Sequence, residues 1–204
     1  MTDANDDSTE SSEQRSTESS EQRNTVESPQ DLGQPSPTER ETEPPASRPL
    51  QKRVADSAVV LQQLTLPEHA NAMGTVHGGV IMKLVDEAGA ICAMRHSQKQ
   101  CVTVWMDSMT FTSPVRVGEV LRLSAHMTFV GQSSMEVAVH VTSEDLIAGH
   151  VTHTNSAYLV FCALGEDGKP TSVPELTVES PAEREHWRQG MARQRRRSQQ
   201  RDDG

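Results

Sequence analysis

Hydrophobic and polar residues alternate along three segments in the second half of the chain, 118–131, 133–143 and 150–164. The apolar positions are Leu121, Leu123, Ala125, Met127 and Phe129 in the first segment, Met135, Val137, Val139 and Val141 in the second, and Val151, Ala157, Leu159, Phe161 and Ala163 in the third. Because side chains alternate between the two faces of a strand, this period of two predicts strands with one face on a hydrophobic core. The connections are too short for parallel crossovers, so we expect antiparallel pairing.

Upstream, the pattern predicts two further strands separated by a helix. The strands are expected over Ser57–Leu66 and Gln100–Phe111. The apolar positions of the second strand are Val102, Val104 and Met106. The helix is expected from Gly78 or Gly79 to about His96, with core-facing spacing. Its apolar stripe is Ile81, Leu84, Val85, Ala88 and Cys92. One long helix and one antiparallel sheet predict an α+β fold in which the sheet wraps around the helix.

Small residues surround a carboxylate on another side of this helix. This side carries Met82, Asp86, Gly89, Ala90 and Ala93. Glycine in a helix interior costs about 1 kcal/mol relative to alanine, so its presence needs a reason. We favour a second packed surface that another backbone approaches closely. The alternative is a solvated face, but such a face would usually carry more charge.

Composition divides the 204 residues into one domain and two tails. The domain is expected over residues 54–174. Residues 1–53 are rich in Glu, Ser, Gln and Pro and repeat the octapeptide STESSEQR, so we expect a disordered N-terminal tail. Residues 175–204 form a C-terminal tail. A capping box at Ser180–Glu183 predicts a short helix over 181–197 within it.

The formal net charge of −10 disfavours nucleic acid and anionic membranes as main partners. A basic run at Arg195–Arg197 could contact nucleic acid or polyphosphate, but we favour a solvated C-terminal tail. No apolar run approaches the ~18 residues of a membrane span, and no secretory signal is visible, so we expect a cytoplasmic protein. Cys92, Cys101 and Cys162 lie in apolar runs without CxxC spacing, which favours buried free thiols.

The stretch NAMGTVHGGVIMKLVDEAGAI, residues 71–91, combines the groups needed to attack an activated acyl group with water. Free N–H groups in the first helical turn, at Gly78, can hold a developing oxyanion. Asp86 lies on the same helix as a candidate base, and Asn71 precedes it by fifteen residues. The histidines lack metal-ligand spacing and no GxGxxG sequence follows a strand, so we expect neither a metal nor a separate cofactor.

Three segments, HANAMGTVHGGVIMKLVDEAGA, MTFTSPVRVGEVL and FVGQSSMEVAVHV, occur in this order without large gaps. Together they resemble the hotdog-fold acyl-CoA thioester hydrolases, in particular the brain-type, cytosolic enzymes and their single-domain bacterial relatives. The resemblance covers about residues 57–174. It implies the hotdog fold, an antiparallel sheet wrapped around one long central helix. It also implies hydrolysis of fatty acyl-CoA to a free fatty acid and CoA, with CoA as part of the substrate.

The resemblance further implies roles for single positions. Asn71 matches the amide that orients the attacking water or the thioester. Gly78 matches the backbone N–H that polarises the carbonyl, and Asp86 matches the carboxylate that acts as general base or nucleophile. The implied substrate-binding residues are His77, Gly79, Ser113, Arg116, Gly131, Ser133, Ser134, Thr154 and Asn155. We expect His77 to shape the helix start rather than to act as a base.

A dimer follows from helix geometry. Gly78 and Asp86 are separated by about 12 Å along one helix, too far to act on one carbonyl carbon. Antiparallel helices of two subunits would bring Asp86 of one chain to the partner subunit's Gly78, so we expect a homodimer with two sites. The resemblance implies that three such dimers join into a hexamer.

Three alternative functions remain open. A non-catalytic hotdog protein could bind acyl-CoA as a sensor, but such proteins usually carry a DNA-binding helix pair, and a retained Asp86 favours turnover. An enoyl-CoA hydratase would need a differently placed Asp–His pair. A pure assembly module would use its tails as the functional part.

Overall fold

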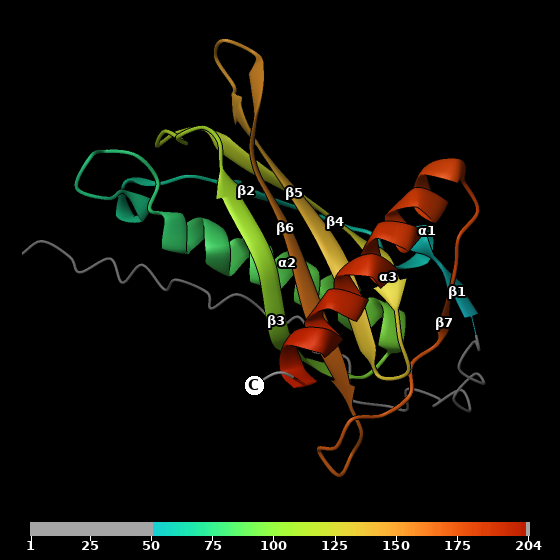
Figure 1. The fold of residues 1–204 in the computed structure, drawn as a ribbon. Helices are drawn as coiled ribbons and strands as arrows, with labels where there is room; N and C mark the ends of the chain where they lie inside the picture. The colour runs from blue at the N-terminus through green and yellow to red at the C-terminus, as the bar shows by residue number, and fades with distance from the viewer. Residues whose placement is uncertain (1–50, 203–204) are drawn as a thin grey trace, which may run out of the picture. The chain divides into compact units, whose positions relative to one another are not determined.

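The structure, a computed structural model, describes residues 51–202 and places a five-stranded antiparallel sheet between two long helices (Figure 1). The predicted N-terminal tail lies outside the described residues, except for residues 51–53. The elements are β1 (Gln51–Arg53), α1 (Val54–Ser57), β2 (Val59–Leu64), the 3-10 helix η1 (Pro67–His69), α2 (Gly78–Ser97), β3 (Gln100–Phe111), β4 (Val120–Val130), β5 (Ser134–Asp145), β6 (His150–Leu164), β7 (Glu175–Thr177) and α3 (Pro181–Asp202).

The large sheet has the strand order β2-β4-β5-β6-β3, and each neighbouring pair is antiparallel. Helix α2 packs on one face, and α3 crosses the opposite face, which we call the outer face (Figure 1). The short strands β1 and β7 pair in parallel. The predicted α+β architecture is confirmed. In the described part of the chain, no helix has the length and apolar character needed to cross a membrane.

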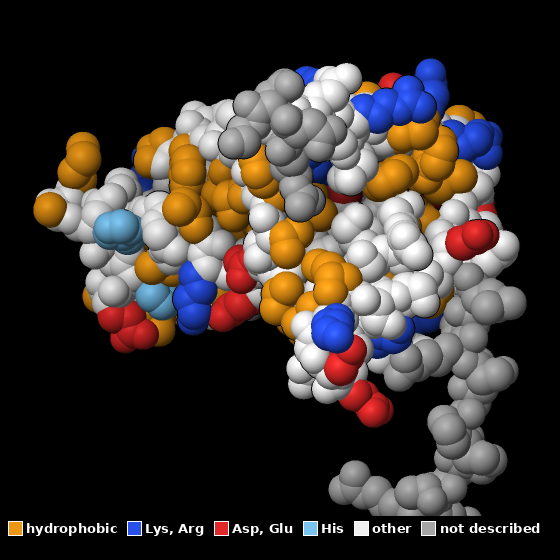
Figure 2. Space-filling view, turned by 60° about the horizontal axis from the view of Figure 1, so that its bottom comes forward, with side chains coloured by type: hydrophobic (Ala, Val, Ile, Leu, Met, Phe, Trp, Pro, Cys, Tyr) orange, Lys and Arg blue, Asp and Glu red, His pale blue; other side chains and the backbone are white. Residues whose placement is uncertain are grey.

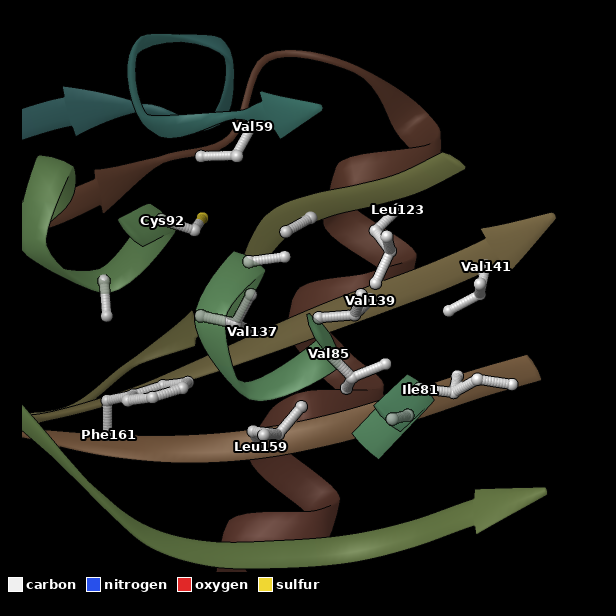
Figure 3. Close-up of a cluster of buried hydrophobic side chains, with 14 of the residues drawn as sticks. Val59, Ile81, Val85, Cys92, Leu123, Val137, Val139, Val141, Leu159 and Phe161 are labelled. Carbon is white, nitrogen blue, oxygen red and sulfur yellow. The ribbon is translucent and has the colours of Figure 1, made fainter. Parts of the chain in front are cut away.

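The hydrophobic core lies between α2 and the sheet. Figure 3 shows side chains of α2 and of strands β2, β4, β5 and β6 in one buried cluster. The predicted stripe of α2 is confirmed, since Ile81, Val85, Ala88 and Cys92 are all buried and Leu84 packs partly against them. The alternation predicted for β4 and β5 also places its apolar residues in this core from Leu121 to Met127 and from Met135 to Val141.

Glycine 89 is required by a close contact between α2 and β6. A Cβ atom at Gly89 would lie 2.9 Å from the ring of Phe161, which is fully buried and cannot move aside. Ala93, also on this side, is fully buried. The expectation of a separate small-residue surface was therefore wrong for Gly89 and Ala93, which face the sheet. Met82 is exposed, and Asp86 and Ala90 remain partly accessible.

Strand β3 forms one edge of the sheet, and several of its apolar residues are exposed. Val102, Val104 and Met106, the apolar positions of the predicted strand, do not share a face, because register shifts interrupt the pairing with β6. The shifts lie between Thr103 and Trp105 and between Met106 and Ser108. Val151 is also exposed, because it lies in the projecting end of the β5–β6 hairpin (Figure 1).

The C-terminal helix is longer and more deeply packed than predicted. It extends beyond the predicted range 181–197, and Arg197 is only 5% exposed because it pairs with Glu136 and Asp107 of the sheet. The expectation of a solvated tail at Arg195–Arg197 was therefore wrong for Arg197, although the side chains of the other two arginines are exposed.

The predictions for the first strand and for the cysteines have different outcomes. The strand predicted over Ser57–Leu66 is shorter, because Ser57 ends α1 and its Oγ lies 3.2 Å from His96 Nδ1. The three cysteines are free thiols, as predicted, with Cys92 buried and the other two partly buried.

Candidate active site

The start of α2 leaves one backbone N–H group unused. His77 is the N-cap, and its Nδ1 accepts a 2.9 Å hydrogen bond from Gly79 N–H. The N–H of His77 donates to His69 O, and the N–H of Val80 donates to His77 O. Gly78 N–H has no partner among the residues that the structure describes. Of the four N–H groups that a helix start normally leaves unpaired, only that of Gly78 therefore remains available to a ligand.

A small pocket opens at this free donor. It has a volume of about 200 Å³ and is lined by Gly78, Ser113 and the ring of Phe111, with Val76, Ile81, Thr112, Pro114 and Val115 completing the wall. The ring of Phe111 lies 3.4 Å from the position that a Cβ atom would take at Gly78. The structure therefore brings together Gly78 and Ser113, two of the predicted site residues.

Asp86 is held by a residue that the sequence patterns did not single out. Thr103 Oγ1, on β3, donates a 2.6 Å hydrogen bond to Asp86 Oδ1. Asp86 lies eight residues after Gly78 on α2, which corresponds to about 12 Å of helix. Within one chain the candidate base and the candidate oxyanion donor are thus well separated. The only sequence signal for Thr103 was a polar residue between two valines.

The side chain of Asn71 organises the loop before α2. Its Oδ1 accepts hydrogen bonds from Met73 N–H at 2.9 Å and from Thr75 N–H at 3.2 Å, and its Nδ2 donates to Thr75 Oγ1 at 3.0 Å. The amide oxygen is thus occupied, and the second hydrogen of Nδ2 is the group that could still reach a ligand. The exposed side chain of Arg116 lies beside this loop, because Thr75 and Arg116 form a β-bridge.

Thr154 and Asn155 are fully buried in β6. Thr154 Oγ1 donates to Val141 O, and Asn155 Nδ2 donates to Thr110 O. Both side chains therefore serve the sheet in this structure, and a direct contact with a bound molecule would require the end of β6 to open.

The turn residues Gly131, Ser133 and Ser134 lie at the other end of the sheet. Ser134 pairs with Cys162 near the end of β6, whereas Phe111, beside Gly78, pairs with Asn155 near its beginning. Seven residues of strand correspond to about 23 Å. Ser133 and Ser134 line a separate pocket of about 540 Å³ together with residues of α3. One chain therefore does not bring this turn to the start of α2.

The charged surroundings of the site contain no cluster suited to a metal ion. Across residues 51–202, no group of three or more His, Cys, Asp or Glu side chains has the geometry of a metal site. The chemistry available at Gly78 and Asp86 is that of a hydrogen-bond donor and a carboxylate.

Comparison with known proteins identifies the family. The family model described as Thioesterase superfamily matches residues 73–150. Protein VdlD of Helicobacter pylori is 34% identical over 140 residues, which cover 69% of this chain and 80% of that protein. The uncharacterised acyl-CoA thioester hydrolase YkhA of Bacillus subtilis is 36% identical over 128 residues, or 63% of this chain and 74% of that protein. The mouse cytosolic acyl coenzyme A thioester hydrolase is 34% identical over 73% of this chain, but the match covers only 40% of the mouse protein.

Solved structures agree with these sequence matches. An acyl-CoA hydrolase from Staphylococcus aureus, in complex with butyryl coenzyme A, coenzyme A and coenzyme A disulfide, has a TM-score of 0.70 and 32% identity, covering 75% of this chain and 93% of that one. Variants of the S. aureus hydrolase with an aspartate, an asparagine or a threonine replaced by alanine have similar scores. An apo-hexameric acyl-CoA thioesterase has a TM-score of 0.71 and 34% identity, covering 74% of this chain and 96% of that one. The chain therefore belongs to the thioesterase superfamily and, within it, to the hotdog-fold acyl-CoA thioester hydrolases.

Proposed function

We propose that the protein hydrolyses fatty acyl-CoA thioesters to free fatty acids and CoA, at a site shared by two subunits. The observation that carries this proposal is the pairing, on one helix, of a single free N–H at Gly78 with a carboxylate at Asp86. The N–H group suits one carbonyl oxygen, and the carboxylate suits a water molecule or the carbonyl carbon.

The reaction divides between these two groups. Gly78 N–H binds the thioester oxygen and stabilises the negative charge that develops on it, an effect worth about 10²–10³ in rate for one such donor. Asp86 takes a proton from water as the water attacks the carbonyl carbon, or attacks that carbon itself. In both routes the C–S bond then breaks, and CoA leaves as a thiolate that takes up a proton. Where Asp86 is the nucleophile, water then hydrolyses the acyl-Asp86 anhydride, which releases the fatty acid and restores the carboxylate.

The separation of the two groups supports a shared site. Asp86 of one subunit would face the partner subunit's Gly78 across a two-fold axis between antiparallel α2 helices. The edge strand β3 suits such an interface, because it exposes apolar side chains, including Val102, Val104 and Met106, and α2 exposes Met82. Figure 2 shows hydrophobic side chains gathered on the face that it views. The unpaired backbone groups of such an edge strand can pair with another chain.

The assembly of dimers and the location are proposed from relatives. The hexameric state of related acyl-CoA thioesterases supports a trimer of dimers for this chain. We place the reaction in the cytoplasm, since the mouse relative is named as a cytosolic enzyme. The formal net charge of −10 supports the expectation that neither nucleic acid nor a membrane is a partner.

Asn71 and Thr103 are proposed to support the two reacting groups. In the S. aureus hydrolase the replaced asparagine and aspartate are 15 positions apart, and the replaced threonine follows the aspartate by 17. Asn71, Asp86 and Thr103 have the same spacings. Thr103 would orient Asp86, and the free hydrogen of Asn71 Nδ2 would orient water or the thioester. Ser113 and Arg116, beside the start of α2, are the residues best placed to contact CoA.

The proposal is tested by paired substitutions and a panel of acyl-CoA esters from short to long chains, with released CoA measured by a thiol reagent. Asp86→Asn should lower kcat by about 10²–10⁴, the range of general acid–base catalysis. Glu87→Gln is the control, because Glu87 is the adjacent acid and pairs with Lys83 on the helix surface. Turnover by Asp86→Asn close to that of the unmodified chain would contradict the assignment. Binding of acyl-CoA without turnover in the unmodified chain would support the sensor alternative.

A complementation experiment tests the shared site. Gly78→Pro removes the free N–H but suits the first position of a helix, and His77 has the extended backbone that precedes proline. Gly78→Ala keeps the N–H and is the control. Chains carrying Asp86→Asn and chains carrying Gly78→Pro, unfolded and refolded together, should regain about a quarter of full activity, since half of the dimers contain one intact site out of two. No recovery in a mixture shown to contain mixed dimers would rule out a site shared in this way.

A further inference from the structure

Four histidines from four different elements form a row that begins at the N-terminal half of α3 and ends at the exposed His153. They are His126 of β4, His140 of β5, His153 of β6 and His186 of α3, and we call them the histidine row. The ring of His126 lies 5.7 Å from that of His140 and 5.3 Å from that of His186, between centroids. His140 and His153 are 6.4 Å apart, and Ser156 Oγ lies 3.2 Å from a ring nitrogen of each.

A bulge in β4 creates the surface on which α3 lies. The register between β4 and β5 shifts between Met127 and Phe129, so Phe129 turns to the outer face instead of joining Met127 in the core. The rings of Phe129 and Trp187 pack against each other, with 5.9 Å between their centroids. Helix α3 comes so close that a Cβ atom at Gly190 would lie 2.7 Å from Phe129 Cβ. The docking face of α3 is thus formed by a histidine, a tryptophan, a glycine and arginines, not by aliphatic residues.

The surroundings of the histidine row favour the uncharged form of its imidazole side chains. Burial lowers the pKa of His126 to about 4, and the neighbouring His140 and His186 add to this shift. Burial also lowers the pKa of His140, with contributions from His153 and His186. Among the residues that the structure describes, one facing acid, Glu183 of α3, favours the protonated form of His126. Hydrogen bonds from the backbone N–H groups of Ser180 and Glu179 lower the pKa of Glu183, so it is ionised near neutral pH.

The remaining charged groups on this face do not offset the histidines. Arg122, four residues before His126 on β4, is exposed and adds positive charge. The C-terminal half of α3 is held by Glu136, which accepts hydrogen bonds from Arg193 at 2.7 Å and from Arg197 at 2.9 Å. Burial opposes ionisation of Glu136, but the hydrogen bonds from Arg193, Thr128 and Arg197, together with the charge of Arg193, outweigh it and lower the pKa. Acidification therefore weakens the contact of α3 with the sheet in two steps. The histidines of the N-terminal half are protonated first, and Glu136, which holds the C-terminal half, is protonated at lower pH.

We propose that α3 is an acid-released latch, which lies on the outer face while the histidine row is neutral and detaches when acid protonates it. Detachment would separate the like charges and uncover Phe129 and Tyr158, the latter now covered by Arg193 at 3.8 Å from the ring centroid. The acid form would thus present a new aromatic surface on the sheet.

The direction of the effect follows from proton linkage. A detached His126 would recover an ordinary pKa near 6.5, so docking is complete above that pH and is lost progressively as the pH falls toward about 4. Between pH 7 and pH 5, His126 alone should weaken docking on the order of tenfold.

Trp187 provides the measurement. The chain has two tryptophans, so Trp105→Phe leaves Trp187 as the only one. In that background we expect its emission to shift to longer wavelength as the pH falls from 6.5 to 4.5, while circular dichroism of the sheet is retained. Unchanged emission down to pH 4.5, or loss of the sheet at the same pH, would overturn the proposal.

Histidine variants distinguish the latch from general acid sensitivity. His126→Gln and His186→Gln should each move the midpoint of the emission change to lower pH by about half a unit or more. His150→Gln is the matched control, because His150 is exposed on the same strand as His153 but lies outside the row. Equal midpoints in the unmodified chain and in both row variants would contradict the proposal. If a variant fails to dock at pH 8, histidine NMR titration of the unmodified chain decides, and an ordinary pKa for His126 would rule the latch out.

Discussion

Thr103 Oγ1 donates a hydrogen bond to Asp86 Oδ1, and this contact links the edge strand β3 to the central helix α2. It occupies one carboxylate oxygen of Asp86 and leaves Oδ2 without a partner among the described residues. The hydroxyl therefore fixes the orientation of the proposed base while one oxygen stays available for water.

Thr103→Val replaces this hydroxyl with a methyl group of similar size. We expect kcat to fall about tenfold, because a hydrogen bond to a charged group contributes about 1.5–3 kcal/mol to holding it in place. Thr103→Ser keeps the donor and should stay within about threefold of the unmodified chain. Steady-state hydrolysis of one acyl-CoA measures the difference. Equal loss in both variants would show that packing of the threonine methyl group, not the hydroxyl, is responsible.

His77→Ala removes the cap of α2. Gly79 N–H would lose its acceptor, so we expect the free energy of unfolding to fall by about 1 kcal/mol, as for other lost helix caps. His77→Asn offers a new cap oxygen and should retain most of the stability. Urea denaturation followed by circular dichroism checks both variants. If the alanine variant were as stable as the unmodified chain, the cap would have no energetic role.

Glu136→Gln leaves Arg193 and Arg197 without their shared counter-charge. The Glu136 side chain is completely buried, and breaking a buried pair by removing one partner typically costs about 3–5 kcal/mol. We therefore expect a large loss in the free energy of unfolding. The exposed pair of Lys83 and Glu87 is the comparison, and Glu87→Gln should change stability by less than about 0.5 kcal/mol. Urea titrations of the two variants under one buffer test this contrast.

Cys92 should be inert toward thiol reagents in the folded protein. Burial raises the pKa of its thiol to about 12, so the reactive thiolate is scarce at pH 8. Burial also raises the pKa of Cys101, although less strongly. We expect iodoacetamide to label Cys92 only after addition of urea, as judged by mass spectrometry of peptides. Rapid labelling of Cys92 in the native chain would show that α2 separates readily from the sheet.

Sequence periodicity predicted the core well where the hydrogen-bond register is regular. In β5, Val137, Val139 and Val141 are buried as the period of two required. In β3, a register shift between Thr103 and Trp105 changes which residues face the core, and the residue pattern does not reveal such a shift. Gly89 was noticed for the right reason, a close approach, but the approaching group is the ring of Phe161 in the same chain.

The site could be predicted in part for similar physical reasons. Gly78 and Asp86 lie on one helix, so their spacing is fixed by local geometry that a sequence reveals. Thr103 meets Asp86 through tertiary packing between β3 and α2, which local patterns do not contain. The docking of α3 was missed because its contact face is polar, and solvated helices have the same composition.

Helix starts that hold phosphate groups usually present several N–H groups at once. Here the backbone and imidazole of His77, together with His69 O, leave a single hydrogen, that of Gly78. One hydrogen matches one oxygen atom, so this end of α2 selects a carbonyl over a phosphoryl group. The phosphate groups of a CoA ester are therefore poor ligands for the start of α2, where its thioester carbonyl has to bind.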